Sequence, residues 1–341
     1  MAGAGRYAEL AAAVHSFKAE LIRPSQIERL VESGSVSEIV GALTKGQVTF
    51  GEESDLNPVE AFLVEKVVEL TNRLASYAPH DSRSLIRLFS TGYELRCLKE
   101  IIRSIADQIP PDDALRHLVP TGEFTQERCK ELIEARNSNR AVEMIRDEAL
   151  KDFLVPRLTA ERSGIAALSA IDQYYYTRLW RASNLPDPLD AQSARLLIGE
   201  LIDNLNILLC FRARVIGLDA KATADLLIPV NYALDRSLTE LTESTSVQNL
   251  TRVLEKTRYA KAFETSSLSS TKASDVELRL YRNHAIACLD AFAGSPFNVG
   301  LALALLFLKN YELHDLFCVI NGRANNVPVE HILASLILRG L

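Results

Sequence analysis

Long hydrophobic runs, an excess of basic charge and an export signal are all missing from this chain of 341 residues. The longest nearly uninterrupted apolar run, Val299 to Leu308, is well short of the ~20 residues that a bilayer-spanning helix needs, so we expect no direct membrane insertion. The formal net charge is −6, and binding to phosphates needs a basic footprint, so nucleic acid is not an expected partner. Because Met1–Arg6 lack the basic region and hydrophobic core of a secretory signal, we expect a cytoplasmic protein.

Paired cysteines and metal-binding histidine motifs are missing as well. The cysteines are odd in number and form no C-x-x-C pair; they are Cys97, Cys129, Cys210, Cys288 and Cys318. Most stand among apolar residues, which is typical of buried thiols in a reducing compartment and not of a disulfide or zinc framework. No H-x-x-x-H, H-E-x-x-H or G-x-S-x-G pattern occurs, so we expect no catalytic residue, no metal site and no cofactor.

Two short stretches match functional motifs only in part. Gly41–Gly46 has the two glycines of a phosphate-binding loop, but Gln47 and Val48 replace the Lys and Ser/Thr that contact phosphate and magnesium. Asp112-Asp113 suggests a magnesium site of the kind that helical prenyl-chain enzymes use. After Pro110-Pro111, however, these acids fit the first turn of a helix, whose dipole favours negative charge. A magnesium-dependent helical enzyme is therefore the least favoured hypothesis for this sequence.

What the sequence does contain is helical periodicity along most of its length. Apolar residues recur at three- and four-residue steps from Tyr7 to Leu21, until Pro24 ends the pattern. The other stripes cover Ile27–Leu43, Ala61–Ala75, Leu85–Ile105, Phe124–Ala135, Ser163–Arg181, Ser193–Val215, Leu238–Leu254, Val276–Phe292, Pro296–Val319 and Glu330–Leu338. Ser295 is expected to cap the helix whose first turn holds Pro296. Alternating β-type runs are nearly absent, so we predict an all-α fold.

One pattern recurs at a fixed distance. Glu94, Asp203 and Glu312 each head an apolar helical stripe; Asp203 follows Glu94 by 109 residues, and Glu312 follows Asp203 by 109. Matching apolar positions surround the three acids, and a polar turn and a second short helix follow each stripe. We predict three related helical domains, with boundaries at residues 1–123, 124–232 and 233–341.

The repeated acids need partners, because an acid on an apolar seam must be paired if it is buried. We predict that arginines of the same or a neighbouring repeat pair with Glu94, Asp203 and Glu312. The candidate partners are Arg96, Arg103, Arg212, Arg214 and Arg323, of which Arg103, Arg212 and Arg323 are the expected anchors of the repeat. Three acids spread over three domains do not make one active site, so a structural clamp is favoured over catalysis.

The most aromatic stretch is Tyr174-Tyr175-Tyr176 with Trp180. On a helix, Tyr176 and Trp180 share a face while Tyr174 points elsewhere. Packing in the core is the favoured role of this stretch, and an interface anchor is the alternative.

Three blocks of this sequence resemble one known family. The block FLKNYELHDLFCVINGRANNVPVEHILASLIL, residues Phe307–Leu338, is similar to the C-terminal signature of the C subunit of archaeal A-type ATP synthases and of its relative, the d subunit of eukaryotic V-type ATPases. The block ELIDNLNILLCFRARVIGLDAKATADLLIP, residues Glu200–Pro229, is similar to the family's Glu-x-Asp-x-x-Asn segment, and YAELAAAVHSFKAELI, residues Tyr7–Ile22, to its first helix. The resemblance covers nearly the whole chain.

The C-terminal signature carries most of this resemblance. In the family, Lys-x-x-Glu-x-x-x-Leu precedes a small basic turn and a Pro-x-Glu helix start. The matching residues here are Lys309, Glu312, Leu316, Gly322-Arg323 and Pro328-Val329-Glu330. Two departures keep the helix and the charge: His314-Asp315-Leu316 stands where Asn-Leu is usual, and Arg323 replaces a lysine.

The resemblance implies a funnel of three similar helical domains around a pseudo-threefold axis. Such a protein would sit on the cytoplasmic face of the membrane rotor ring, attached peripherally, and would receive the lower end of the central shaft. Its implied partners are the central-shaft subunits and the ring subunits, and its implied role is to couple shaft rotation to ion flow without catalysis. The competing hypothesis is a helical-repeat scaffold that binds soluble partners.

Overall fold

The computed structural model describes residues 2–32, 35–48, 56–158, 164–263 and 273–341. Over these ranges the chain forms seventeen α-helices and two short 3-10 helices, and it contains no strand beyond an isolated bridge between Thr121 and Phe124. The all-α prediction is confirmed. None of the described helices combines the length and the hydropathy that a membrane crossing requires.

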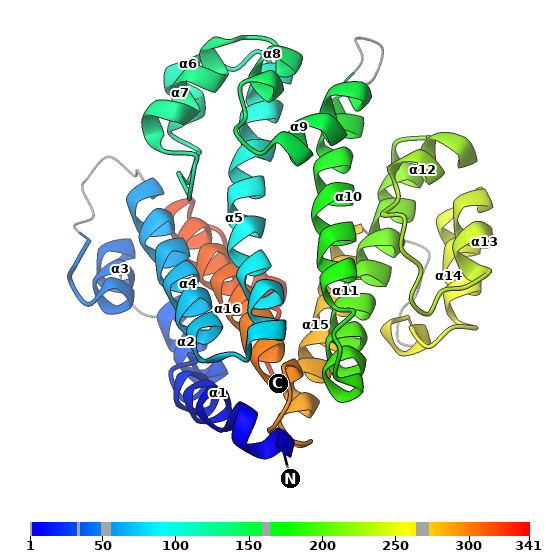
Figure 1. Cartoon of the computed structure of the whole chain (residues 1–341). Helices are drawn as coiled ribbons and strands as arrows, with labels where there is room; N and C mark the ends of the chain where they lie inside the picture. The colour runs from blue at the N-terminus through cyan, green and yellow to red at the C-terminus, as the bar shows by residue number, and fades with distance from the viewer. Residues whose placement is uncertain (1, 33–34, 49–55, 159–163, 264–272) are drawn as a thin grey trace.

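Six long helices form the frame of the molecule, and they come as three hairpins. The hairpins are α4 (Asn57–Tyr77) with α5 (His80–Ala106), α10 (Gly164–Ala182) with α11 (Pro188–Val215), and α15 (Ala273–Ala291) with α16 (Gly300–Ala324). The hairpins also pack on one another, because α5 contacts α10, α11 contacts α15, and α16 contacts α4. The contacts therefore close a cycle, and Figure 1 shows these helices running side by side through the molecule.

Short helices surround the frame in three groups (Figure 1). The groups are α6 (Pro111–Leu115), α7 (Gln126–Glu134), α8 (Ser138–Glu143) and α9 (Glu148–Leu154); α12 (Ala220–Leu226), α13 (Ser237–Glu243) and α14 (Val247–Leu254); and α2 (Pro24–Glu32), α3 (Val36–Thr44) and α17 (Val329–Ser335). The 3-10 turns Val155–Arg157 and Ala260–Ala262 accompany the first and second groups. The N-terminal helix α1 (Ala2–Lys18) lies across the lower end in this view, packed against α4 and α16.

The apolar core has one central and three outer parts. The central cluster joins α1 to all six long helices and to Ile337 and Leu338. One outer cluster lies between α5, α6–α9 and α10, a second between α11, α13, α14 and α15, and the third between α2, α3, α4, α16 and α17. Each outer cluster thus joins one hairpin to the next, so the predicted boundaries at 123/124 and 232/233 fall within connected structure and stay a prediction about the sequence repeat.

The long helices α5, α11 and α16 end in the same way. The backbone is left-handed at Gln108, Gly217 and Asn326, with φ of 55°, 78° and 54°. One residue later, the N–H groups of Ile109, Leu218 and Val327 donate to the carbonyls of Ser104, Ala213 and Gly322 at 2.9, 2.9 and 2.8 Å. This six-to-one bond beside a left-handed residue is the Schellman arrangement that satisfies the last carbonyls of a helix. The three helix ends recur at the spacing of the repeated acids.

Several predicted helix bounds are wrong. The stripe Ile27–Leu43 is two helices, since Pro24 opens α2 and Ser35 caps α3 in a capping box with Glu38. The stripe Leu238–Leu254 is also divided, because Ser246 caps a new helix after α13 ends.

The start of α16 differs from the prediction too. The helix begins at Gly300, not in the turn of Pro296, and Ser295 accepts only a weak bond from the N–H of Phe297 at 3.4 Å. Its first N–H groups go to Asn298, which accepts from Gly300 at 2.8 Å, and to buried Asp190 of α11, which accepts from Val299 at 2.9 Å. A long-range acceptor therefore replaces the local cap.

Candidate functional site

The repeated acids lie near the middle of α5, α11 and α16, where each helix meets another part of the chain. Asp203 of α11 is fully buried and accepts from the N–H groups of Tyr232 at 3.2 Å and Ala233 at 2.7 Å. The hydroxyl of Tyr259 donates to the same carboxylate at 2.7 Å. Burial raises the pKa of Asp203, and these three hydrogen bonds oppose that rise because they favour the ionised form. Asp203 therefore fastens α11 to the segment that leads into α13.

Glu94 lies in the corresponding place on α5. Its carboxylate lies against Gly122, where a Cβ atom would come within 2.0 Å of the Glu94 Oε1 atom, and Gly122 has a φ of 60° that favours glycine. Burial raises the pKa of Glu94, and the negative charges of Glu123 and Asp147 raise it further. The contact joins α5 to the segment that leads into α7.

Glu312 likewise fastens its helix, α16, to another segment, which here lies near the N-terminus. Its Oε1 atom accepts from the N–H of Ile22 at 2.5 Å, and its Oε2 atom accepts from the Lys309 ammonium at 2.8 Å. Ile22 belongs to the connection between α1 and α2, so Glu312 ties α16 to the N-terminal part of the molecule. The side chains of Glu312 and Lys309 are 8% and 14% exposed, so this ion pair is shielded from solvent more than the pairs on the surface.

A second set of residues, three positions after each acid, was missed by the sequence analysis. These residues are Cys97, Asn206 and Asp315. The Oδ1 atom of buried Asn206 accepts from the N–H of Ile228 at 2.9 Å, and its amide donates to the carbonyls of Ile228 and Val230 at 3.1 and 3.2 Å. Asn206 thereby satisfies three backbone groups of the chain that follows α12.

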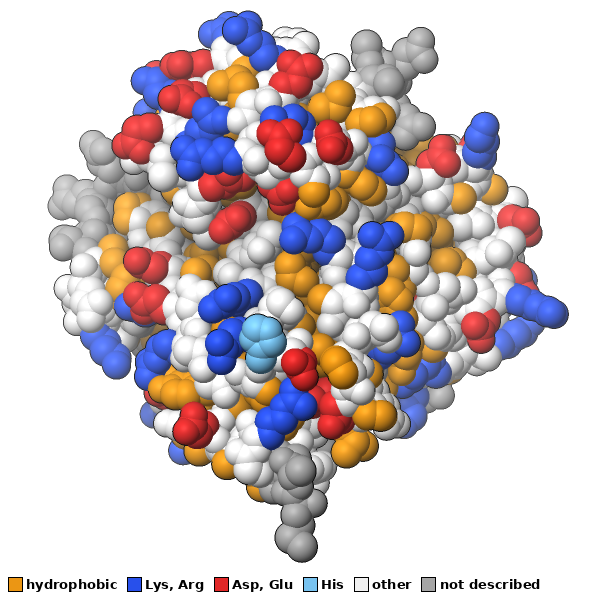
Figure 2. Space-filling model, in the orientation of Figure 1, with side chains coloured by type: hydrophobic (Ala, Val, Ile, Leu, Met, Phe, Trp, Pro, Cys, Tyr) orange, Lys and Arg blue, Asp and Glu red, His pale blue; other side chains and the backbone are white. Residues whose placement is uncertain are grey.

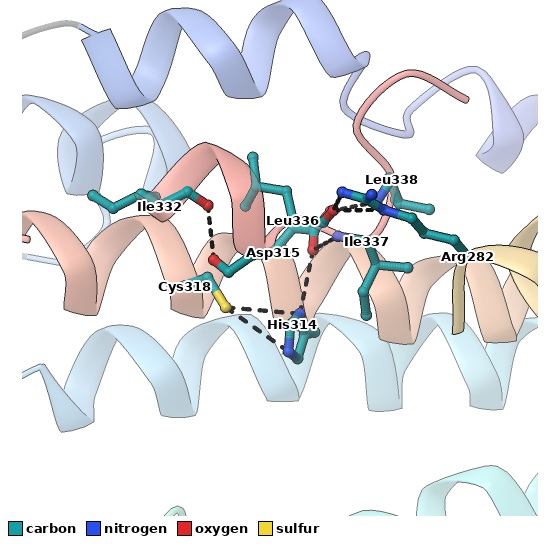
Figure 3. Close-up of polar contacts among 9 residues, drawn as sticks. Arg282, His314, Asp315, Cys318, Ile332, Leu336, Ile337 and Leu338 are labelled. Atoms are coloured by element: carbon teal, nitrogen blue, oxygen red, sulfur yellow. Dashed lines mark hydrogen bonds and ion pairs between the residues drawn. The ribbon is translucent and has the colours of Figure 1, made fainter. Parts of the chain in front are cut away.

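Asp315 holds the chain that follows α17, as Figure 3 shows. Its two carboxylate oxygens accept from the N–H groups of Ile337 at 2.7 Å and Leu338 at 2.8 Å, and the carboxylate is fully buried. The carbonyl of Leu336 is held from the other side by the guanidinium of Arg282 at 2.7 and 3.2 Å. The end of the chain is thus fixed to α16 and α15 at once.

Figure 3 also shows His314 and Cys318 beside this carboxylate. The Nδ1 atom of His314 lies 3.2 Å from the Asp315 Oδ1 atom, and the Cys318 sulfur lies 3.8 Å from the imidazole. Burial alone would lower the pKa of His314, but the hydrogen bonds to Asp315 and Cys318 and the charges of these groups raise it to about 9. His314 is therefore a cation near neutral pH and balances the buried Asp315.

The second set escaped detection because its members differ in chemistry. A thiol, an amide and a carboxylate share no residue class, so a search for like residues at a fixed spacing passes over them. The sequence nevertheless contains a signal for these residues in two of the three repeats. A polar residue three positions after the acid lies close to it on the same side of a helix. Two polar residues on one otherwise apolar face predict that both have partners.

The predicted pairing of the acids with arginines is wrong for two of the three anchors. Arg103 pairs with Glu100 at 2.9 Å, and Arg212 pairs with Glu277 at 2.7 Å. The reason is helical geometry, because nine residues advance a helix by about two and a half turns and place these arginines opposite their acids. Arg323 lies in the last turn of α16 and is half-buried.

The other predicted partners, Arg214 and Arg96, form no hydrogen bond with the acids within the described ranges. Arg214 donates to the carbonyl of Thr242 at 3.5 Å, and Arg96 is exposed on α5. Asp203 and Glu312 accept instead from backbone N–H groups, a tyrosine hydroxyl and a lysine. Backbone donors stay in place without ordering a long side chain, so they fit a buried seam better than arginine does.

The two partial motifs have structural explanations. Gly41–Gly46 spans the end of α3, where Lys45 is left-handed and the N–H of Gly46 donates to the carbonyl of Gly41 at 3.1 Å. Asp112 and Asp113 occupy the first turn of α6 and are exposed, and Asp113 lies 3.5 Å from Arg116. Within the described ranges, no group of three or more His, Cys, Asp or Glu side chains could hold a metal ion.

The aromatic stretch packs inside the molecule. Tyr174 lies in the outer cluster around α9, where its hydroxyl contacts Asp147 at 3.2 Å and Arg178 at 2.9 Å. Tyr175 and Tyr176 pack against the central cluster, as does Trp180, whose ring contacts that of Tyr232 edge-on. The favoured interpretation of core packing agrees with these contacts.

One face of the molecule carries mixed charge. On the face that Figure 2 shows, acidic and basic side chains are interspersed with apolar ones and no large area has a single sign. Such a surface suits contacts between proteins more than the binding of a polyanion.

Comparison with known proteins identifies relatives over almost the full length. Residues 10–335 match the model of the ATP synthase (C/AC39) subunit family. The C subunit of the A-type ATP synthase of Methanocaldococcus jannaschii is 24% identical, over 97% of this chain and 86% of the relative. The C subunits of the A-type ATP synthases of Methanosphaera stadtmanae and Pyrococcus horikoshii are 24% and 22% identical, over 92% and 95% of this chain and 83% and 89% of the relatives.

We expect Asp315→Asn and Asn206→Asp each to destabilise the fold, although they exchange the same two residue types. Asp315→Asn turns an acceptor of two N–H groups into a group with one donor end, and should lower the free energy of unfolding by about 2–3 kcal/mol. Asn206→Asp places a carboxylate beside the carbonyls of Ile228 and Val230 and should cost about as much. The measurement is equilibrium denaturation by urea.

The exposed Asp112→Asn is the matched control for this pair, and its change should stay within about 0.5 kcal/mol. If either buried variant were as stable as the wild type, the hydrogen bonds of Asp315 or Asn206 would not hold the chain in place.

The raised pKa of His314 predicts a pH dependence. The protonated form is favoured in the folded state, so its contribution to stability is complete below the ordinary pKa of 6.5 and disappears as the pH rises through about 9. Because the side chain is 46% exposed, water screens the pair and the loss should stay below about 1 kcal/mol. Urea denaturation of the wild type and of His314→Gln across this pH range measures it. A stability difference between the two that does not shrink with rising pH would contradict the assignment.

Proposed function

Because the chain belongs to the ATP synthase (C/AC39) subunit family, we propose that it is the adaptor that joins the central shaft of a rotary ATPase to the membrane ring that translocates ions. The relatives are named as subunits of A-type ATP synthases, and the proposed role of this chain is to connect parts of such a complex and not to catalyse a reaction. The observation that carries the proposal is the match over residues 10–335, which includes the three hairpins and α17.

The geometry supports a mechanical part. A socket that passes torque from one body to another must resist shear, and close-packed helices deform little. The six long helices contact one another in a closed cycle, and buried side chains fasten the connections between them. A load applied to one hairpin is therefore shared with both of its neighbours.

The same proposal includes the shape that the family resemblance implies. In it, residues 1–123, 124–232 and 233–341 are three copies of one helical unit around a pseudo-threefold axis and form a funnel. The matching ends of α5, α11 and α16 and the three outer clusters support a triplicated unit. In this arrangement each copy contributes one hairpin to the surface that faces the shaft. Each copy also shares an outer apolar cluster with the neighbouring copy.

The proposed partners are proteins on two sides. The central-shaft subunits would enter from one side, and the ring subunits would bind on the other, so the chain would be attached peripherally to the cytoplasmic face of the membrane through the complex. Mixed charge on the face that Figure 2 shows suits a contact of this kind, because opposite signs set the register between partners.

Reconstitution of the rotary complex with and without this chain tests the proposal. Without it, the soluble head should still hydrolyse ATP, because the head's nucleotide sites lie outside this chain, while ATP-driven ion pumping into vesicles should fall to background. Adding the purified chain back should restore pumping.

The control for the add-back is a chain with Asp112→Asn, which alters only an exposed helix start. Unchanged ion pumping in the complex that lacks the chain would refute the adaptor role. Recovery of the chain from native membranes with soluble proteins and without ring subunits would favour the scaffold hypothesis instead.

A further inference from the structure

Cys97 and Cys129 bring two buried thiols into contact where neither repeat partner has a sulfur. Cys97 lies on α5 and Cys129 on α7, and their sulfur atoms are 3.6 Å apart. The two residues are 3% and 0% exposed, and both thiols are free. The helices α5 and α7 pack against each other in the same outer cluster.

The place of Cys97 in the repeat gives this contact a meaning. In the other two repeats the corresponding residues, Asn206 and Asp315, bond directly to the chain that returns from a short helix. Cys97 has only weak thiol hydrogen bonds to offer at this position. The backbone N–H of Thr121, in the chain that returns from α6, does hydrogen-bond to the Cys97 sulfur. A covalent bond to Cys129 would add a stronger fastening, between α5 and α7.

A cavity gives a small reagent a route to this pair. It has a volume of about 290 Å³, and Cys97 forms part of its wall. Arg96 and His117 line the same cavity and are exposed, so the cavity reaches the solvent. A water molecule takes up about 30 Å³ in the liquid, so a molecule of peroxide size fits easily.

The two thiols are not equivalent. The contact between the two sulfur atoms raises the pKa of Cys97, as burial also does, and lowers the pKa of Cys129. Cys129 lies on α7, and its thiol also donates to the carbonyl of Phe124 at 3.6 Å. Cys97 forms part of the cavity wall and Cys129 does not, so Cys97 is the sulfur that a reagent in the cavity meets first.

We propose that Cys97 and Cys129 are a peroxide-responsive pair that forms a reversible disulfide between α5 and α7. In the first step the Cys97 sulfur attacks one oxygen of hydrogen peroxide; the S–O bond of a sulfenic acid forms, the O–O bond breaks, and the leaving hydroxide takes up the Cys97 proton and departs as water. In the second step the Cys129 sulfur attacks the Cys97 sulfur; the S–S bond forms, the S–O bond breaks, and the hydroxyl leaves as water with the Cys129 proton. Two thiols and one peroxide thus give one disulfide and two waters. The sulfurs must approach by about 1.5 Å to reach bonding distance.

The test uses the reduced full-length chain treated with hydrogen peroxide under native conditions, then alkylated and digested without reductant. The wild type should lose two hydrogens, contain a peptide pair bridged through Cys97 and Cys129, and return to the thiol form with dithiothreitol. Its melting temperature should rise by a few degrees on oxidation, because the bond closes a loop in the unfolded chain. Cys129→Ser should instead accumulate a sulfenic acid at Cys97 that dimedone captures.

Cys210→Ser is the matched control, since Cys210 is equally buried but lies in another cluster; this variant should form the bridge as the wild type does. Half-exposed Cys318 reports that the peroxide is active. Oxidation of Cys318 without a bridge between Cys97 and Cys129 would overturn the proposal, and so would a bridge that forms only in denaturant.

Discussion

The rest of this structure depends on one kind of hydrogen bond. In it, a side-chain oxygen on a long helix accepts a hydrogen bond from a backbone N–H group in a segment that connects two helices or follows the last one. Such N–H groups would otherwise be buried without partners, which costs free energy comparable to a lost hydrogen bond. Asp203 receives two of them, Asp315 receives two, and Asp190 receives the one at the start of α16. Because these acceptors sit on the long helices, the connections lie at fixed places on the frame.

This constraint links the local structure to the proposed role. A hairpin of two helices alone has no fixed angle to its neighbour, but a connection bonded to one hairpin and continuing into the next removes that freedom. The outer clusters add apolar contacts across the same junctions, and Glu312 joins α16 to the connection after α1. The result is a closed set of six helices with few independent motions, which suits a part whose task is to pass on torque.

Sequence reasoning reached the fold class, most helices and the family, because periodicity and the quoted blocks are local signals. It did not reach features set by distant residues. The start of α16 depends on Asp190, which lies far away in the chain, so local capping logic placed it too early at Ser295. The stripes Ile27–Leu43 and Leu238–Leu254 kept their apolar spacing across breaks, so periodicity alone joined them. The acids were recognised, but the backbone partners of Asp203 and Glu312 could not be predicted from side-chain types, and Arg103 and Arg212 were the wrong expectation.

Hydrogen exchange resolved to single amides tests the central claim most directly. The amides of Ala233, Ile337 and Leu338 lie outside regular helices, yet each donates to a buried carboxylate at 2.7 or 2.8 Å. If these hydrogen bonds to Asp203 and Asp315 hold the frame together, the three amides should exchange as slowly as those in the middle of α16, because each can exchange only when the core opens. Exchange at the rate of a solvated turn would contradict the account.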